Sequence, residues 1–216
     1  MTCCTRYCAA EAQFGSERAQ SDLRLYRRRG PVGVTRVLLA ELRRRPLEDK
    51  QLLDVGAGIG VISAELAGSG LAGTTVAEAS PAYLEVARQV VEPRYKSGST
   101  EFVLGDFALL AETLPDADLV TLDRVVCCYP DGNALLQAAA SKTRQLLAFT
   151  YPRDRWDVRV TVALQNLWRR LKGSTFKVFV HPAKEMCASV ESKGFVRVAR
   201  RGTFVWVVDV YGRAPA

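Results

Sequence analysis

Residues 52–66, LLDVGAGIGVISAEL, constrain the fold of this chain more than any other stretch. A short apolar run that ends in glycine is typical of a buried parallel strand, and the mixed apolar spacing that follows is typical of a helix. Gly56, Gly58 and Gly60 lie between the two. Glycine lets the backbone approach a ligand closely, and the N-terminus of a helix offers unpaired N–H groups. The stretch therefore predicts a strand, a ligand-binding turn and a helix.

The glycine spacing argues against two common nucleotide sites. A dinucleotide fingerprint has the spacing G-x-G-x-x-G, and Val61 occupies its third glycine position. A phosphate-binding loop ends in Gly-Lys-Ser/Thr, and this stretch has no lysine. The pattern that fits is Asp-x-Gly-x-Gly-x-Gly, beginning at Asp54.

Two further acidic residues follow predicted strands. Residues 74–77 indicate a second strand that ends at Glu78, and residues 101–104 indicate a third strand that is followed by Asp106. With the glycine pattern, this arrangement resembles the class I S-adenosylmethionine-dependent methyltransferases, over roughly residues 35 to 150. The resemblance implies that the glycine turn passes beneath the methionine part of the cofactor, that Glu78 accepts hydrogen bonds from the ribose hydroxyls, and that Asp106 contacts the adenine amino group. The predicted cofactor-binding residues are Asp54, Gly56, Gly58, Gly60, Glu78, Asp106, Phe107 and Asp123.

The resemblance also implies the fold: a Rossmann-like, seven-stranded, mostly parallel α/β sheet with an antiparallel last strand and helices on both faces. We expect residues 1–46 to form a helical extension over the active site and residues 47–216 to form the methyltransferase domain. Later strands are expected at 117–122, 145–150 and 176–180, and a terminal hairpin at 195–199 and 203–211 with its turn at 200–202.

The segment 123–131 follows the fourth strand, so it is expected to line the pocket beyond the carboxyl ends of the strands. The candidate substrate-binding residues are Tyr26, Arg124, Tyr129, Arg153 and Trp156. The candidate catalytic residues are Tyr129 and His181, the latter as a general base because histidine titrates near neutral pH. A lone histidine beside a proline is as often structural, and a carboxylate or thiolate acceptor would require no base.

Residues 152–173 indicate a helical insertion with apolar residues three and four positions apart and arginines around them. Such a helix could be a lid over an apolar substrate, a dimer face, a membrane-surface helix, or a helix packed on the domain.

Composition limits the possible partners. The chain of 216 residues has a net charge of +7, which admits an anionic partner, but its basic residues are scattered as on a solvated surface. No apolar run reaches the ~18 residues of a membrane span, and no secretory signal is evident. Six cysteines without such a signal favour the reducing cytoplasm. Cys3, Cys4 and Cys8 are too few for a zinc site without a further ligand, so no metal is expected.

The predicted function is methyl transfer from S-adenosylmethionine to an oxygen, nitrogen or sulfur atom of a small molecule. The segments RRRG, LDRVVCCYPD, VHP and FVWVVDVY are similar to bacterial proteins grouped with magnesium-protoporphyrin IX O-methyltransferases, which implies an anionic, apolar acceptor. The alternatives are an RNA methyltransferase and a cofactor-binding protein without activity; a nicotinamide-dependent oxidoreductase is disfavoured by the glycine spacing. We expect a monomer or homodimer that does not bind nucleic acid.

Overall fold

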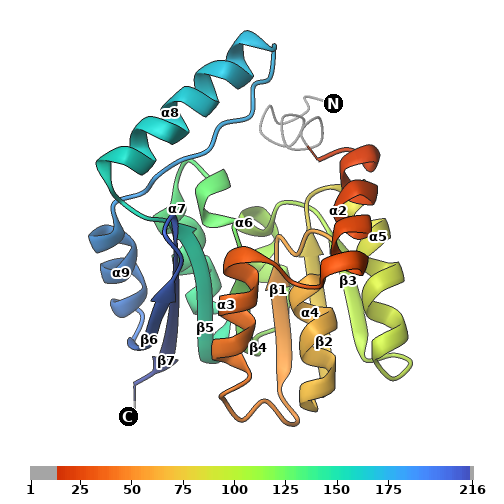
Figure 1. The fold of residues 1–216 in the computed structure, drawn as a ribbon. Coiled ribbons are helices and arrows are strands. Elements are labelled where there is room, and N and C mark those ends of the chain that lie inside the picture. Colours follow the sequence, from red (N-terminus) through yellow and green to blue (C-terminus); the bar gives the residue numbers. More distant parts are fainter. Residues whose placement is uncertain (1–13, 215–216) are drawn as a thin grey trace.

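A seven-stranded sheet in the order β3-β2-β1-β4-β5-β7-β6 forms the centre of the molecule (Figure 1). The computed structural model describes residues 14–214. The strands are β1 (Gln51–Val55), β2 (Gly73–Glu78), β3 (Thr100–Leu104), β4 (Ala117–Leu122), β5 (Thr143–Pro152), β6 (Phe195–Gly202) and β7 (Trp206–Arg213). Strands β1 to β5 pair in parallel, and β7 runs antiparallel to both β5 and β6. The predicted fold class is confirmed.

Helices cover both faces of this sheet (Figure 1). They are α2 (Ser16–Arg29), α3 (Gly33–Leu42), α4 (Val61–Leu66), α5 (Pro81–Val91), α6 (Phe107–Leu110), α7 (Gly132–Ser141), α8 (Trp156–Leu171) and α9 (Ala183–Glu191). The start of α5 follows the sequence prediction, because Pro81 is its first residue and the Ser80 hydroxyl accepts a hydrogen bond from the Tyr83 N–H at 3.3 Å.

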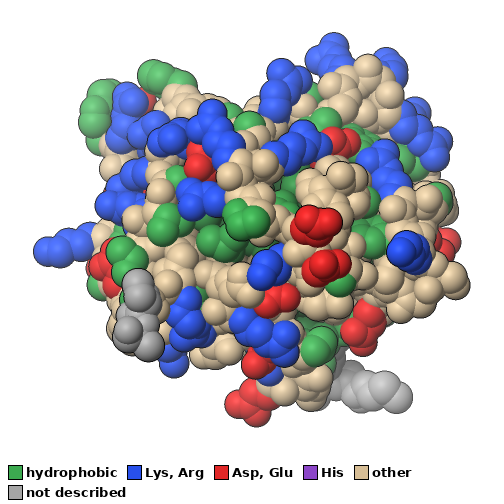
Figure 2. All heavy atoms as spheres, turned by 90° about the horizontal axis from the view of Figure 1, so that it is seen from below, with side chains coloured by type: hydrophobic (Ala, Val, Ile, Leu, Met, Phe, Trp, Pro, Cys, Tyr) green, Lys and Arg blue, Asp and Glu red, His purple; other side chains and the backbone are tan. Residues whose placement is uncertain are grey.

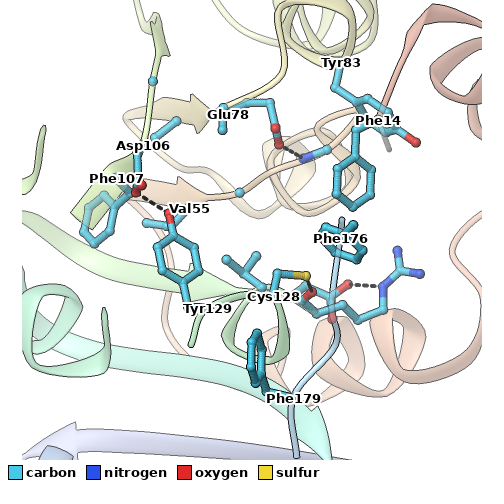
Figure 3. A pocket seen from close by; sticks show the side chains of 18 of the residues that line it. Phe14, Val55, Glu78, Tyr83, Asp106, Phe107, Cys128, Tyr129, Phe176 and Phe179 are labelled. Carbon is cyan, nitrogen blue, oxygen red and sulfur yellow. Dashed lines mark hydrogen bonds and ion pairs between the residues drawn. The ribbon is translucent and has the colours of Figure 1, made fainter. Parts of the chain in front are cut away.

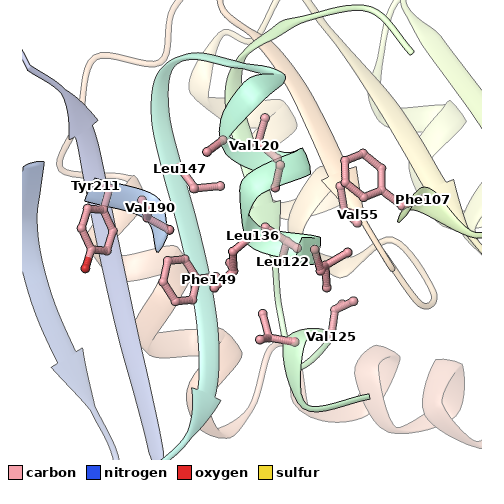
Figure 4. Packing of buried hydrophobic residues seen from close by; sticks show 14 of the residues in the cluster. Val55, Phe107, Val120, Leu122, Val125, Leu136, Leu147, Phe149, Val190 and Tyr211 are labelled. Carbon is pink, nitrogen blue, oxygen red and sulfur yellow. The ribbon is translucent and has the colours of Figure 1, made fainter. Parts of the chain in front are cut away.

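Three hydrophobic clusters fill the space between the sheet and its helices, and β1 contributes to two of them. Neighbouring residues of a strand point to opposite faces, so Leu53 belongs to the cluster with residues of α7 and α9, whereas Leu52 belongs to the cluster with residues of α3 and α4. Aromatic rings extend the first cluster toward β7, where Phe149 and Tyr211 stack with their centroids 5.8 Å apart (Figure 4). This packing fixes the strand ends that build the site.

The two N-terminal helices have different positions. Leu38 and Leu42 of α3 are fully buried in the cluster on the sheet, so α3 is part of the core and not a cover over the site. Helix α2 lies beside α5 (Figure 1), and the hydroxyl of Tyr83 donates a hydrogen bond to Asp22 at 2.6 Å. The predicted boundary at residue 46 stays a prediction.

The C-terminal part differs from the sequence prediction in two places. Residues 200–202 belong to β6, and the turn lies at 203–205, where the Thr203 N–H donates to the carbonyl of Trp206 at 2.8 Å. The run 176–180 is extended but forms no strand, because its partner is a side chain: Asn166 of α8 binds both backbone groups of Val178, at 2.7 and 3.0 Å. This segment crosses the carboxyl end of the sheet toward α9.

Candidate active site

The glycine turn after β1 has three left-handed residues, with φ of 59° at Gly56, 57° at Gly58 and 76° at Gly60. Only Gly56 and Gly58 line a cavity. A Cβ at Gly60 would lie 2.5 Å from Cγ2 of Val91, so this glycine allows α4 to pack against α5. Gly60 thus has a packing role beneath the turn, and its contact with the cofactor stays a prediction.

Asp54 is fully buried and does not line the cavity. Its carboxylate accepts hydrogen bonds from the hydroxyls of Ser63 at 2.9 Å and Thr121 at 2.8 Å. Burial raises the pKa of Asp54 to about 6, and these hydrogen bonds oppose that shift. Alternation along β1 turns Asp54 away from the cavity and Val55 toward it, and the contact between Asp54 and the cofactor stays a prediction. Asp54 therefore positions the glycine turn.

Glu78, at the end of β2, lines the cavity and is 9% exposed. One carboxylate oxygen accepts a hydrogen bond from the Gly58 N–H and the other from the Ser80 N–H, both at 2.8 Å. Burial raises the pKa of Glu78, while the backbone hydrogen bonds act in the opposite direction. Each oxygen keeps a second lone pair, so the carboxylate is oriented and can still accept from a pair of hydroxyls.

Asp106 and Phe107 follow β3 and line the end of the cavity that lies across from Phe14 and Phe176 (Figure 3). The carboxylate of Asp106 caps α6 by accepting from the Ala108 N–H at 3.0 Å, and it also accepts a hydrogen bond from the hydroxyl of Tyr129. Burial, followed by that hydrogen bond, raises the pKa of Tyr129 far above its usual value. Tyr129 is therefore a neutral donor at physiological pH, and not a proton acceptor.

Asp123 and Arg124, after β4, form the third group. Asp123 accepts hydrogen bonds from the hydroxyls of Thr35 and, at 2.8 Å, Thr150. Arg124 has a φ of 60°, and its N–H donates to the Thr150 hydroxyl at 2.7 Å. A left-handed backbone at a residue other than glycine stores strain that the surroundings must hold, and such residues cluster at functional sites. The Arg124 guanidinium lies 3.6 Å from Asp123 with 59% of the side chain exposed.

The cavity joins these groups and has a volume of about 580 Å³, which is within the usual range for small-molecule sites. Its remaining walls are aromatic: Phe14 lies edge-to-face on Tyr83 at 5.7 Å and on Phe176 at 5.3 Å between ring centroids (Figure 3). Phe179 completes this side. The turn glycines, Glu78 and Asp106 therefore line the same cavity as these aromatic rings.

Four of the predicted substrate-binding and catalytic residues also lie outside the cavity. The His181 ring bonds the carbonyls of Val126 and Tyr129 at 3.1 and 2.9 Å, so it anchors the 174–182 segment. Tyr26 donates to Glu65 at 2.7 Å, and the Arg153 side chain donates to the Thr203 carbonyl at 2.9 Å, in each case away from the cavity. Trp156 is 79% exposed on α8.

Several lining residues were not predicted from sequence: Phe14, Arg18, Asp22, Tyr83, Cys128, Thr175, Phe176, Lys177 and Phe179. They come from α2 and the residue Phe14 before it, from α5, from the segment after β4 and from the 174–182 segment, which meet only in the folded chain. The adjacent Cys127 and Cys128 are free thiols, and the hydrogen bond between them lowers the pKa of Cys128. No group of three or more metal-binding side chains occurs within residues 14–214, and Cys3, Cys4 and Cys8 lie outside that range.

Comparison with known proteins agrees with this geometry. Residues 53–145 match the model of a family described as a methyltransferase domain. This match shows a methyltransferase domain at residues 53–145, which, with the strand order, agrees with the predicted enzyme class and methyl donor. A search of curated proteins found no match.

Solved structures share the fold at low sequence identity. Magnesium protoporphyrin IX methyltransferase from Synechocystis PCC 6803, with bound S-adenosylhomocysteine, is 18% identical with a TM-score of 0.67, and the match covers 84% of this chain and 82% of that one. An O-methyltransferase family protein from Burkholderia thailandensis is 16% identical with a TM-score of 0.66, covering 85% and 57%. An O-methyltransferase family 2 protein from Planctomyces limnophilus in complex with apigenin is 16% identical with a TM-score of 0.62, covering 82% and 56%.

Proposed function

We propose that this protein transfers the methyl group of S-adenosylmethionine to a carboxylate oxygen of a flat, largely apolar small molecule. The observation that carries the proposal is the character of the cavity beyond the glycine turn. Its walls are the rings of Phe14, Tyr83, Phe176 and Phe179, and its lining includes the cationic side chains of Arg18, Arg124 and Lys177. Rings bind a planar apolar body, and guanidinium groups bind carboxylates.

The same cavity supports a position for the cofactor. Gly56 and Gly58 would let the backbone approach the methionine part, Glu78 would accept from the ribose hydroxyls, and Asp106 would accept from the adenine amino group. S-adenosylmethionine supplies a methyl carbon that its sulfonium already activates. The task of the protein is therefore to bind and orient the acceptor in line with that carbon.

The lining also favours an acceptor that needs no proton removed. None of the described lining residues is a histidine. The Tyr129 phenol has a strongly raised pKa, and Asp123 is engaged by two hydroxyls and by Arg124. A carboxylate is already ionised at neutral pH, since its pKa lies near 4. The geometry therefore supports carboxylate methylation better than methylation of an alcohol.

Two structural neighbours are consistent with a small-molecule acceptor, since one is a magnesium protoporphyrin IX methyltransferase and the other is an O-methyltransferase in complex with apigenin. An RNA acceptor stays the alternative. Figure 2 shows the end of the molecule away from the cavity, where lysine and arginine side chains are interspersed with acidic ones, so this face lacks the clustered positive charge on which nucleic-acid binding relies.

The test is methyl transfer from labelled S-adenosylmethionine to a panel of planar aromatic carboxylic acids and their neutral amides. We expect esters from the acids only, with kcat/KM constant between about pH 6 and about pH 8 because the acceptor stays ionised. Arg124→Ala should lower kcat/KM about tenfold to a hundredfold, while Arg144→Ala, an exposed arginine on β5, should not. Methylation of the amides, or a rate that rises tenfold per pH unit, would refute carboxylate transfer.

A further inference from the structure

Helix α8 presents an apolar face to solvent. Its exposed residues recur three and four positions apart, so they form one stripe along the helix. They are Trp156 (79% exposed), Val160 (50%), Leu164 (62%), Leu167 (53%), Trp168 (59%) and Leu171 (78%). We call this set the α8 stripe. Soluble monomers rarely expose a contiguous apolar patch of this kind, and such patches mark interaction surfaces.

The stripe is not exposed because α8 is loosely attached. The opposite side of the helix is held to the rest of the chain: Val158 is 4% exposed, and Asn166 makes two hydrogen bonds to the backbone of Val178. Helix α8 thus has one face that anchors it and another that is free. Figure 1 shows it projecting beyond the carboxyl ends of the strands.

Phe204 extends this apolar surface beyond the N-terminal end of α8. Phe204, in the β6–β7 turn, is 71% exposed, and the guanidinium of Arg155 lies 4.9 Å from the centre of its ring. At the other end, the ammonium of Lys172 lies 4.0 Å from the ring of Trp168. Aromatic rings with a cation above them therefore stand at both ends of the stripe. Tryptophan and basic side chains together are typical of membrane–water interfaces.

The charge around the stripe selects the partner. The basic residues from 154 to 172 are Arg155, Arg159, Arg169, Arg170 and Lys172, against the acidic Asp154 and Asp157. Arg159 pairs with Asp154 at 2.6 Å and Arg155 with Asp157 at 3.0 Å, which leaves Arg169, Arg170 and Lys172 without an acidic partner among the described residues. A second copy of the chain would bring the same cationic rim against this one, which is unfavourable. An anionic lipid surface complements both the rim and the stripe.

We propose that α8, with Phe204, docks this protein on the surface of an anionic lipid bilayer. The helix lies in the plane of the interface, with the α8 stripe in the acyl boundary and the arginines at the phosphates. This differs from a membrane span: no helix within residues 14–214 is long and apolar enough to cross a bilayer. Membrane docking is inferred from the α8 stripe, Phe204 and the basic residues around them, and it does not depend on which acceptor is methylated.

The test is co-sedimentation of the full chain with vesicles of phosphatidylglycerol and phosphatidylcholine, compared with vesicles of phosphatidylcholine alone. We expect binding to the anionic vesicles to be at least about tenfold tighter, and to weaken with added salt. Leu164→Glu should weaken binding to anionic vesicles about tenfold or more. The matched control is Val196→Glu: Val196 is 53% exposed on β6, at the opposite end of the sheet, and this change should leave binding unaltered.

Sedimentation velocity and cofactor binding complete the experiment. A Leu164→Glu variant that still binds S-adenosylhomocysteine is folded, so its loss of vesicle binding would support the proposal even if no acceptor is found. Absence of binding to anionic vesicles would overturn the proposal. So would equal loss in the Leu164→Glu and Val196→Glu variants, or a dimer that Leu164→Glu converts to a monomer while vesicle binding is unchanged, since the stripe would then bind a second copy.

Discussion

Replacing Gly60 by alanine tests how the glycine turn is built. The backbone at Gly60 is left-handed, and an added Cβ would lie 2.5 Å from Cγ2 of Val91. Gly98 is the matched control, because its φ is 81° and a Cβ there would meet nothing within 4 Å. Both substitutions carry about 1–2 kcal/mol of backbone strain, and Gly60→Ala adds about 1–3 kcal/mol of overpacking. The free energy of unfolding should therefore fall by about 2–5 kcal/mol for Gly60→Ala, and by about 1–2 kcal/mol for Gly98→Ala.

Urea unfolding of both variants measures the difference, and a double-mutant cycle isolates the clash. Val91→Ala removes the methyl group that a new Cβ would meet, so the double variant Gly60→Ala, Val91→Ala should be less destabilised than the sum of the single changes, by about 1–3 kcal/mol. Equal losses for Gly60→Ala and Gly98→Ala, together with additivity in the cycle, would refute the reasoning. In that case the left-handed backbone at Gly60, and not the close approach of Val91, would explain why glycine is required there.

Two further predictions concern the acidic residues. Burial raises the pKa of Asp54 from 3.8 to about 6, so the folded protein keeps this proton where the unfolded chain has lost it, and stability falls as the pH rises through that window by roughly 3 kcal/mol. Asp54→Asn should flatten this fall in urea titrations at a series of pH values; an unchanged slope would contradict the assignment. Glu78→Gln gives the Gly58 and Ser80 N–H groups a single acceptor and places an amide donor against the other. Its affinity for S-adenosylhomocysteine by calorimetry should drop about tenfold to a hundredfold, whereas the exposed Glu85→Gln should behave as the parent.

Local sequence patterns sufficed for most of the sheet, because short apolar runs between glycine and proline have few alternatives. They failed where pairing at a distance decides the outcome. Strand β5 extends to Pro152 because β7 pairs with its residues 146–152, and no local signal at 151–152 indicates this. The run 176–180 has the composition of a strand, but Asn166 occupies the place of a neighbouring strand.

The acids at the strand ends illustrate what the sequence could and could not predict about the site. Glu78, Asp106 and Asp123 line the cavity as expected, since parallel strands end at one edge of the sheet. Asp54 does not, because its direction depends on which face of β1 packs against α4. The aromatic wall was not predicted from the sequence. Phe14 and Phe176 lie more than a hundred residues apart in the chain, and only tertiary packing brings their rings into contact.

The bond between Asn166 and Val178 links two parts of the molecule that otherwise have separate roles. The amide makes one donor and one acceptor contact to a single residue of the segment that carries Phe176 and Phe179. A tilt of α8 would therefore move the aromatic side of the cavity, because these two hydrogen bonds join the helix to that segment. Binding at the α8 stripe and the position of Phe176 and Phe179 in the cavity would then be coupled through Asn166.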